Sequence, residues 1–487
     1  MRPLRLLYGG AAVIALAATT VTTVTGPSVA QASPSSPPAG TKGGTGATTS
    51  TASRAESVHA AMTLDQRIGQ LFMVATPADS ASSALRTVVA DQHVGNVILM
   101  GRSTAGADRT RAVTTAVQTM TEPTARTRGV PAFVSADQEG GNVQVLRGPG
   151  YSDMPTALVQ GRSSDTALRT DAQRWGTQLS RSGVNTNLGP VLDVVSAQYK
   201  PINQPIGRYD REYGATPSVV TAKGGAVQSG MTRAGVATTV KHFPGLGRVR
   251  GNTDTSSGVT DTYTTTGSSI IDPFASAVRR GTPFVMMSSA IYSRIDASQP
   301  ALFSGAVVTS LLRRQLGFDG VVMTDDVGNA AQLSGYPAGE RATRFVDAGG
   351  DMVLTARTDT LPAMVAAVRS RASSSPAFRA KVDAAALRVL RAKEDAGLLQ
   401  SRGTPSGNFT SWTVKRLQGW LGKTPTGTWD TATIRSVQYR IGTPTSGRWD
   451  ARSFAALQRF LGISTDGTST WDARTTTQLQ RYLNTQL

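Results

Sequence analysis

The chain has 487 residues, with 50 Lys and Arg against 32 Asp and Glu, and it has no cysteine. Its length exceeds that of one ordinary domain, and the lack of cysteine excludes disulfide bonds and thiolate metal sites. The net charge of +18 favours an anionic partner. Because the Lys and Arg residues are scattered and not interleaved with aromatic residues, we expect an acidic cell-wall polymer and no nucleic acid.

Residues 1–32 have the pattern of a signal peptide. Arg2 and Arg5 precede an apolar stretch from Leu6 to Ala18, and residues 30–32 form an Ala-x-Ala cleavage pattern. A membrane anchor is the alternative, but the apolar stretch is short for a bilayer and no cysteine follows it for a lipid anchor. We expect a secreted protein, extracellular or associated with the cell wall, without stable membrane insertion. Residues 33–56 are predicted to be a disordered linker because they are rich in Ser, Pro, Gly and Thr.

Short β-branched runs alternate with helical patterns over residues 57–400. One helical pattern covers Leu302 to Leu316, where apolar residues recur at helical spacing. Eight such β/α units predict an α/β fold, a (β/α)8 TIM-type barrel. A doubly wound open sheet is the alternative, which the lack of a Gly-rich phosphate loop after the first strand disfavours. The predicted strands are 71–74, 96–99, 132–134, 186–194, 236–240, 284–287, 321–323 and 352–354.

The end of the chain is repetitive. After a predicted linker at residues 401–411, a Leu-Gln or Val-Gln pair recurs within residues 412–487, and its Gln is residue 418, 438, 458 and 480. Trp429, Trp449 and Trp471 are each followed by Asp, and a Gly precedes each pair. This spacing predicts a Gly turn, an Asp-capped short helix and a small all-α repeat domain. The three Trp residues are expected to anchor the core of each repeat, which leaves binding to the surface.

Several predicted strands end in polar side chains, which is where α/β barrels place their active sites. Lys241 and His242 begin the run KHFPGLG after the fifth strand, and Asp254 and Ser256 follow in the same loop. Asp325 and its neighbour end the seventh strand, where an Asp is either a catalytic carboxylate or a cap of the next helix. The remaining polar segments are 135–147 (SADQEGGNVQVLR), 187–193 (NLGPVLD) and 206–214 (IGRYDREYG).

These segments, together with residues 62–73 (MTLDQRIGQLFM), resemble the motifs of family 3 glycoside hydrolases of the β-N-acetylglucosaminidase type. The resemblance implies that Asp325 is the nucleophile and that the loop of Asp254 carries the acid/base. It implies no metal and no cofactor. It also implies that the sugar is held by Asp137, Arg211, Lys241 and His242.

Other polar residues in these segments are expected to have different roles. Arg208 competes with Arg211 for the sugar-binding position, because the segment contains an insertion, and we favour Arg211. Asp326 is expected to cap a helix, and both Asp193 and Glu139 are expected to be structural.

The chain departs from the family pattern at the acid/base. The family has an Asp-x-His dyad in the loop after KHFPG, whereas Ser256 stands in place of the His. A serine hydroxyl is too weak an acid to replace an imidazolium at neutral pH. Three alternatives stay open: Asp254 is itself the acid, Glu139 or Glu212 takes over, or the barrel binds sugar with little or no turnover. Glycines in and beside the loop lead us to expect a mobile loop that delivers an acid on closure.

The sequence therefore predicts an exported, retaining glycosidase that removes β-linked N-acetylglucosamine from peptidoglycan fragments or chitin oligomers. The alternative is a degenerate barrel that acts as a wall- or sugar-binding protein. The repeats resemble the peptidoglycan-binding-like repeats of exported wall enzymes, and this resemblance implies attachment to the cell wall. We expect a monomer.

Overall fold

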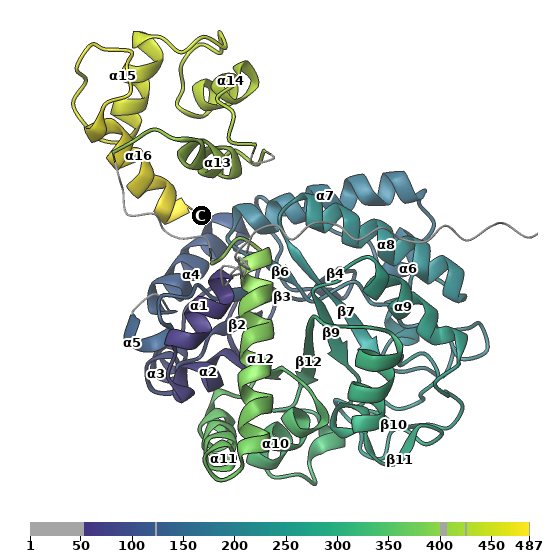
Figure 1. The fold of residues 1–487 in the computed structure, drawn as a ribbon. Coiled ribbons are helices and arrows are strands. Elements are labelled where there is room, and N and C mark those ends of the chain that lie inside the picture. The colour runs from purple at the N-terminus through teal and green to yellow at the C-terminus, as the bar shows by residue number, and fades with distance from the viewer. Residues whose placement is uncertain (1–52, 122–123, 400–406, 424–425, 487) are drawn as a thin grey trace, which may run out of the picture. The chain divides into compact units, whose positions relative to one another are not determined.

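The computed structural model describes residues 53–121, 124–399, 407–423 and 426–486. In this part of the chain, eight parallel strands close into a barrel, in the order β1-β13-β12-β9-β7-β6-β3-β2. Helices surround the strands (Figure 1). The barrel confirms the predicted fold class and excludes the open sheet. The strands are β1 (Phe72–Pro77), β2 (Asn96–Met100), β3 (Phe133–Ala136), β6 (Thr186–Asn187), β7 (Ala237–Phe243), β9 (Phe284–Met287), β12 (Val321–Asp326) and β13 (Met352–Thr355).

The fourth barrel strand differs from the prediction of residues 186–194. Only Thr186 and Asn187 form ladder pairs with both neighbouring strands. Pro190 follows shortly after, and a proline has no N–H to donate to a ladder. One isolated bridge between Val191 and Lys241 then continues the contact with β7. The chain therefore leaves the barrel wall early, and the segment that contains Asp193 becomes free to turn toward the site.

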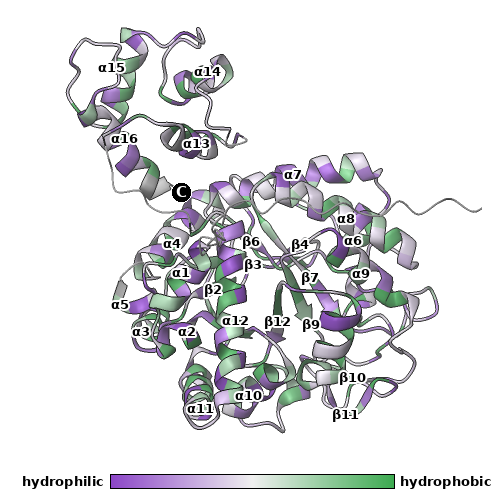
Figure 2. Ribbon diagram, in the orientation of Figure 1, coloured by the Kyte–Doolittle hydropathy of each residue, from purple (hydrophilic) through white to green (hydrophobic). Residues whose placement is uncertain are grey.

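The helices around the barrel each bury one face. Their residues alternate between hydrophobic and hydrophilic along the ribbon (Figure 2). The pattern predicted over residues 302–316 is helical, but it contains a short 3-10 helix, η3 (Ala301–Phe303), and a π-helix, η4 (Ala306–Gln315). The other long helices are α1 (Arg54–Ala61), α2 (Leu64–Gln70), α3 (Ser83–Gln92), α4 (Gly106–Thr121), α7 (Asp165–Arg181), α8 (Pro217–Arg233), α9 (Asp272–Arg279), α10 (Ala338–Ala348), α11 (Leu361–Ser374) and α12 (Pro376–Asp395).

Helix α1 begins at Arg54, inside the stretch expected to be a linker, because Ser53 and Glu56 form a capping box. The predicted signal peptide and most of that linker lie outside the described residues. Among the helices of the described ranges, none is both long enough and apolar enough to cross a membrane.

The barrel interior is packed with side chains, as expected for this fold. Phe133 and Phe284 meet edge to face, with ring centroids 5.1 Å apart. These first residues of β3 and β9 belong to the same buried cluster as Val389 and Ala392 of α12. Helix α12 therefore closes the amino-terminal end of the barrel, and in Figure 1 it lies across the front of the strands. The carboxyl-terminal end is left for the polar residues that follow the strands.

The C-terminal repeats form a small helical module with its own core. The described residues from 407 onward contain four helices, α13 (Ser411–Trp420), α14 (Thr431–Arg440), α15 (Ala451–Phe460) and α16 (Ala473–Gln486). Leu417, Val437, Leu457 and Leu479, one from each helix, are buried together. Asp430 and Asp450 cap α14 and α15 as predicted from the Trp-Asp pairs. Each repeat therefore contributes one helix to a common core.

The same glutamine contact links each repeat to the next. Gln438 Oε1 accepts from Gly447 N at 2.8 Å, and its Nε2 donates to Arg448 O and Ser453 Oγ at 2.8 and 2.9 Å. Gln418 and Gln458 make corresponding contacts with the repeats that follow them.

The fourth glutamine closes the module. Gln480 Nε2 donates to Asn408 O and Thr413 Oγ1 at 3.0 and 2.9 Å, which returns the chain to its first repeat. Phe409 stands where the other repeats have Trp, and it stacks on Trp471 with centroids 3.7 Å apart. The repeats therefore form a closed set of four.

Candidate active site

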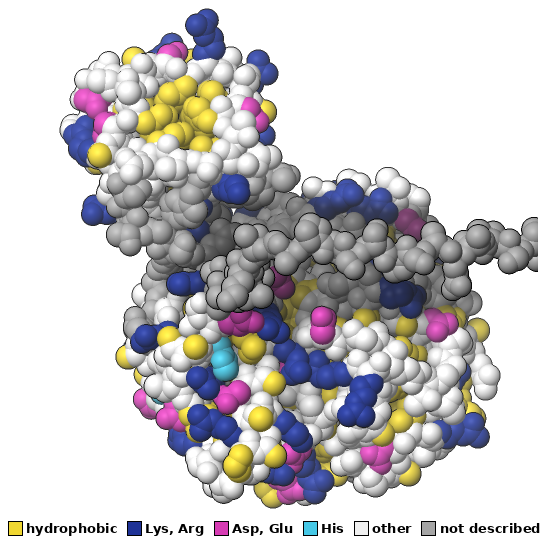
Figure 3. All heavy atoms as spheres, viewed as in Figure 1, with side chains coloured by type: hydrophobic (Ala, Val, Ile, Leu, Met, Phe, Trp, Pro, Cys, Tyr) yellow, Lys and Arg dark blue, Asp and Glu magenta, His cyan; other side chains and the backbone are white. Residues whose placement is uncertain are grey.

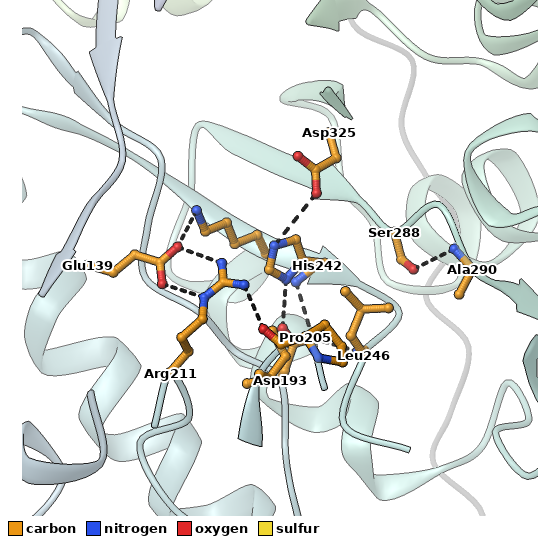
Figure 4. A network of polar contacts seen from close by, with 12 residues as sticks. Glu139, Asp193, Pro205, Arg211, His242, Leu246, Ser288, Ala290 and Asp325 are labelled. Carbon is orange, nitrogen blue, oxygen red and sulfur yellow. Dashed lines mark hydrogen bonds and ion pairs between the residues drawn. The ribbon is translucent and has the colours of Figure 1, made fainter. Parts of the chain in front are cut away.

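The predicted site residues come from three strand ends and one connecting segment at the carboxyl-terminal end of the barrel. Asp137 follows β3, Lys241 and His242 lie in β7, and Asp325 lies in β12. Arg211 lies in the segment between η1 (Gly207–Tyr209) and α8. Figure 4 shows His242 between the Arg211–Glu139 pair and Asp325. The closed barrel thus brings together residues that are up to 188 positions apart, from 137 to 325.

Asp325 faces the imidazole of His242. The His242 Nε2 atom lies 3.8 Å from Asp325 Oδ2, and the other ring nitrogen, Nδ1, lies 2.7 Å from Asp193 Oδ2. Asp193 is fully buried, and its Oδ1 also accepts from Leu246 N at 2.7 Å. Since Asp193 holds Nδ1, the Nε2 atom is the nitrogen turned toward the site. Asp325 itself is 31% exposed, so a substrate can reach it.

Glu139 ties two cations together. Arg211 donates to both of its carboxylate oxygens at 2.8 Å, and Lys241 Nζ lies 2.6 Å from Oε1. Burial alone would raise the pKa of Glu139, but the charges of Arg211 and Lys241 outweigh it and hold that pKa at about 2. Glu139 is 4% exposed. It therefore stays ionised at neutral pH and cannot act as a proton donor.

Lys241 also reaches the rim of the site. Its Nζ lies 2.6 Å from Asp137 Oδ1, and Asp137 is 24% exposed. Burial lowers the pKa of Lys241, but the carboxylates of Asp137 and Glu139 more than compensate and keep it raised. The Lys241 ammonium is therefore a fixed positive charge, with Asp137 as its partner on the solvent side.

The two arginines that were candidates for the sugar-binding position lie in different surroundings. Arg211 is mostly buried against Glu139, whereas Arg208 is exposed and lies over the ring of Tyr209 at 5.9 Å. Arg211 also donates to Pro205 O at 2.9 Å. The site therefore contains Arg211, and Arg208 points to the surface.

Asp254 has the raised pKa expected of an acid. Its side chain reaches solvent, yet the protein around it partly desolvates the carboxyl, and the nearby charge of Asp325 repels it. Together these effects raise the pKa of Asp254 to about 6, against the smaller opposing effects of His242 and Arg211. Asp254 is thus the carboxyl beside Asp325 that can hold a proton near neutral pH.

The other candidates for the acid lie in different surroundings. Glu212 is buried and paired with Lys200, which also contacts Asp210 at 2.5 Å. Burial raises the pKa of Glu212, against the opposing effect of its partner Lys200, and the charge of Asp210 raises it further. Ser256 follows Asp254 in the loop, and its backbone N donates to Asn252 O at 2.8 Å. Asp326 was expected to cap a helix, but it accepts from Gly328 N after β12 and from Ala356 N after β13, and neither of these residues begins a helix.

Two supports of the site were missed by sequence reasoning. Tyr292 OH donates to Gly245 O at 2.9 Å, which fixes the turn after KHFP from the segment that follows β9. Gln332, after β12, binds the loop of Asp254. Neither residue stands in a motif, and both act on backbone atoms far away in sequence. Among the described residues, no group of three or more His, Asp or Glu is placed to hold a metal ion.

The arrangement of carboxylates and a fixed imidazole at the carboxyl-terminal end of a (β/α)8 barrel is that of a barrel glycosidase. The model of the glycosyl hydrolase family 3 N-terminal domain matches residues 63–392. The chain therefore belongs to glycosyl hydrolase family 3.

Similar proteins with a named activity narrow the class of glycosidase. A β-hexosaminidase from Stenotrophomonas maltophilia is 32% identical over 265 residues, which cover 53% of this chain and 76% of the relative. The crystal structure of a β-N-acetylhexosaminidase from Beutenbergia cavernae is 48% identical, with a TM-score of 0.67 over 68% of this chain and 99% of that one. A family 3 β-N-acetylglucosaminidase from Paenibacillus is 29% identical, with a TM-score of 0.64 over 70% and 64% of the two chains. The protein is a glycosidase of the β-hexosaminidase type.

Proposed function

We propose that this protein is exported and removes β-linked N-acetylglucosamine from peptidoglycan fragments or chitin oligomers with retention of configuration. The observation that carries the proposal is the pair of unlike carboxyls. Asp325 faces the imidazole of His242, whereas Asp254 has a pKa of about 6. A carboxyl that holds a proton near neutral pH is suited to act as the acid beside a second carboxyl that acts as the nucleophile.

In the first step, Asp325 attacks the anomeric carbon and forms a glycosyl ester. The bond from that carbon to the leaving oxygen breaks as Asp254 transfers its proton to that oxygen. Asp254 is left as a carboxylate, which the cations of the site stabilise. A sugar leaving group needs this proton, because an alkoxide is a poor leaving group at neutral pH.

In the second step, the Asp254 carboxylate takes a proton from water as the water oxygen attacks the anomeric carbon. The ester bond to Asp325 breaks, and both carboxyls return to their starting states. A pKa near the working pH allows Asp254 to serve first as acid and then as base.

The sugar is held by groups already fixed before it binds. Asp137 accepts hydrogen bonds from hydroxyls at the exposed rim, while Lys241 and Arg211 donate from below and His242 presents Nε2. Their partners Glu139 and Asp193 hold these groups in place through the contacts described above. Donors that need no rearrangement stabilise developing charge at least cost.

The test compares release of nitrophenol from an aryl β-N-acetylglucosaminide with hydrolysis of chitobiose. Nitrophenolate leaves without protonation, whereas the sugar needs an acid. We expect both reactions, with chitobiose hydrolysis falling as the pH rises above about 6. Reaction of the aryl glycoside alone would exclude Asp254 as a working acid. Sugar binding without either reaction would make the barrel a binding protein.

We also propose that the repeat module attaches the enzyme to an anionic wall polymer. Residues 407–487 contain ten Lys or Arg and four Asp, a net charge of +6. Asp430, Asp450 and Asp472 each accept from a backbone N–H at a helix start, and Asp466 accepts from Thr468 N. The acidic side chains therefore serve the fold, while most of the basic ones are exposed.

An aromatic cluster with one arginine is the surface we assign to this binding. At the carboxyl-terminal ends of the four helices, Trp420, Phe460 and Tyr482 meet with centroids 5.1 to 5.8 Å apart, and Arg440 lies 5.0 Å from the Trp420 ring. Phe460 is 38% exposed and Arg440 is exposed. Figure 3 shows that the module does expose a hydrophobic area on the side in view. Aromatic rings suit sugar faces, and the guanidinium suits a carboxylate or phosphate.

Binding is measured by sedimentation of the full chain with purified cell walls. Phe460→Ala and Arg440→Gln should reduce the bound fraction, whereas Arg452→Gln, an exposed arginine on α15, should not. Deletion of residues 408–487 should abolish it. Equal sedimentation of all forms would exclude attachment through the module. Recovery of a mature chain beginning near residue 33 from the culture medium would test export.

A further inference from the structure

The loop that carries Asp254 is fastened to the segment that follows Asp325. Ala331 N donates to Asp254 O at 3.2 Å, and Gln332 N donates to Thr253 O at 3.0 Å. Both donors lie at the short 3-10 helix η5 (Ala331–Leu333). The two carboxyl-bearing segments are therefore joined by backbone hydrogen bonds, which differs from the mobile loop expected from its glycines.

The Gln332 side chain makes the second half of this attachment. Its Oε1 accepts from Val259 N at 2.9 Å, and its Nε2 donates to Val259 O at 3.2 Å. Gln332 and Val259 are both buried. One residue of η5 thus binds the loop twice, through its backbone before Asp254 and through its amide after it.

The loop between these two points has little to hold it otherwise. Gly258 has φ +70°, and no atom lies within 4 Å of the position that a Cβ would take there, so the chain turns in open space. Within the loop, Asn252 accepts from Ser256 N and caps Asp254 N, which shapes the turn locally. These local bonds shape the turn, while the contacts with η5, together with the bond from Ile291 N to Val259 O at 3.0 Å, fix where the loop lies.

We propose that Gln332 is a positioning residue for the acid step, which holds the Asp254 loop against the segment that follows Asp325. This proposal rests on the proposed function, in which Asp254 is the acid. A retaining glycosidase needs its two carboxyls about 5–5.5 Å apart. In this chain the spacing follows from a single short segment, because Asp325 and Gln332 are only seven residues apart. Loss of the amide contacts lets the loop move away while Asp325 stays in place.

The pKa of Asp254, which sets the alkaline limb of the pH profile, depends on the charged groups that face it. They are Asp325 and Asp326 from β12, His242 from β7 and Arg211 from the segment after η1. A loop that moves outward takes the Asp254 carboxyl away from Asp325 and from the protein atoms that partly desolvate it. Its pKa then falls toward the ordinary value, so the alkaline limb of chitobiose hydrolysis shifts to lower pH.

The experiment compares Gln332→Met with Gln118→Met. Gln118 makes the same two contacts with one backbone residue, accepting from Ala132 N at 2.8 Å and donating to Ala132 O at 3.0 Å, at the amino-terminal end of the barrel. Each methionine keeps the length of the side chain and removes both hydrogen bonds. We expect the two variants to lose similar amounts of thermal stability. Gln118→Met is therefore a control for the structural effect of losing two such hydrogen bonds.

Only Gln332→Met should change the acid step. Its kcat/KM for chitobiose should fall by about 10–100-fold, part of what general acid catalysis contributes, while the aryl glycoside changes by less than about threefold. Equal losses on both substrates, an unshifted pH limb, or the same pattern in Gln118→Met would overturn the proposal. If Gln332→Met does not fold, Gln332→Glu replaces it, since the acceptor for Val259 N remains.

A third variant separates this proposal from the proposed function. Asp254→Asn should lower chitobiose hydrolysis by about 10²–10⁴-fold and leave no pH limb for Gln332 to shift. If Asp254→Asn hydrolyses chitobiose like the parent, Asp254 is not the acid and the proposed function fails. If Asp254→Asn loses chitobiose hydrolysis while Gln332→Met keeps the parent kcat/KM and pH limb, Asp254 remains the acid and Gln332 has no positioning role.

Discussion

The barrel site and the repeat module hold their polar groups in place with different kinds of contact. In the barrel, each group occurs once, and the contacts are between charges: Glu139 joins Arg211 and Lys241, and Asp193 holds His242. In the module, one uncharged contact from glutamine to a backbone N–H and a hydroxyl recurs from repeat to repeat. The barrel concentrates its chemistry in unique residues, whereas the module distributes its stability over equivalent ones.

This difference explains which sequence changes the chain tolerates. Phe409 replaces a Trp in the first repeat, and the aromatic cluster still closes around Trp471 and Trp429. In the barrel, the replacement of a histidine by Ser256 removes a proton donor that has no second copy. The proposed function assigns the acid to Asp254, the carboxyl beside Asp325 with the raised pKa.

The sharpest test of a unique residue is Asp325→Asn. An amide cannot form the glycosyl ester, so turnover of the aryl glycoside should fall on the order of 10⁴-fold, while sugar binding and thermal stability change little. Asp319→Asn, at the other end of the same strand and exposed, is the control for the lost charge. The measurement is kcat for both variants with the aryl glycoside. Hydrolysis by Asp325→Asn at the parent rate would show that Asp325 is not the nucleophile.

Asp254→Asn should have the next largest effect. Chitobiose hydrolysis should fall by about 10²–10⁴-fold, with a smaller loss in formation of the ester from the aryl glycoside. In the parent, the acid must be protonated, so activity on chitobiose is present below a pH of about 6 and falls above it. A pH–rate series on both substrates checks this. If the alkaline limb survives in Asp254→Asn, another group carries the proton.

The sequence predicted the strands of the barrel more completely than their lengths and contacts. All eight strands were located because β-branched runs and helical patterns have different periods. The fourth strand was drawn too long, since Pro190 continues an apolar run but cannot continue a ladder. The closure of the repeats was also missed, because Phe409 lacks the Trp-Asp pattern and Gln480 binds residues more than 70 positions earlier.

Within the site, sequence reasoning found the residues that stand in motifs and missed those that act on backbone atoms. Asp193 was expected to be structural, but its partner, His242, is 49 positions away and is revealed only when the chain leaves β6 early. Gln332 carries no motif, and its contacts are with the backbone of Val259, which any sequence would supply. A side chain that binds a backbone atom places no requirement on the residue type at the position it binds, so the sequence shows no sign of the contact.

Glu139→Gln tests the charged contacts of the barrel. The folded pKa of Glu139, about 2, lies below its usual 4.5, so its ionisation stabilises the fold above pH 4.5 and this contribution is lost as the pH falls toward 2. The shift corresponds to about 3 kcal/mol at neutral pH. Denaturant unfolding of parent and variant at pH 7 and pH 3 should show a gap that narrows at low pH. Glu340→Gln, from an exposed pair with Arg344, should cost under about 1 kcal/mol. A gap that does not change with pH would contradict the ion-pair account.

Gln438→Met should have the smallest effect on activity, and it tests whether the module is independent. The variant leaves Gly447 N and the hydroxyl of Ser453 without their partner, at a cost of about 1–3 kcal/mol. Because the module has its own buried core, the loss should appear only in its own unfolding transition, while the barrel transition and chitobiose hydrolysis stay at parent values. A calorimetric scan beside the hydrolysis assay measures both. If the barrel transition moves as well, the module and the barrel share stability, and distributed contacts in one region support unique contacts in the other.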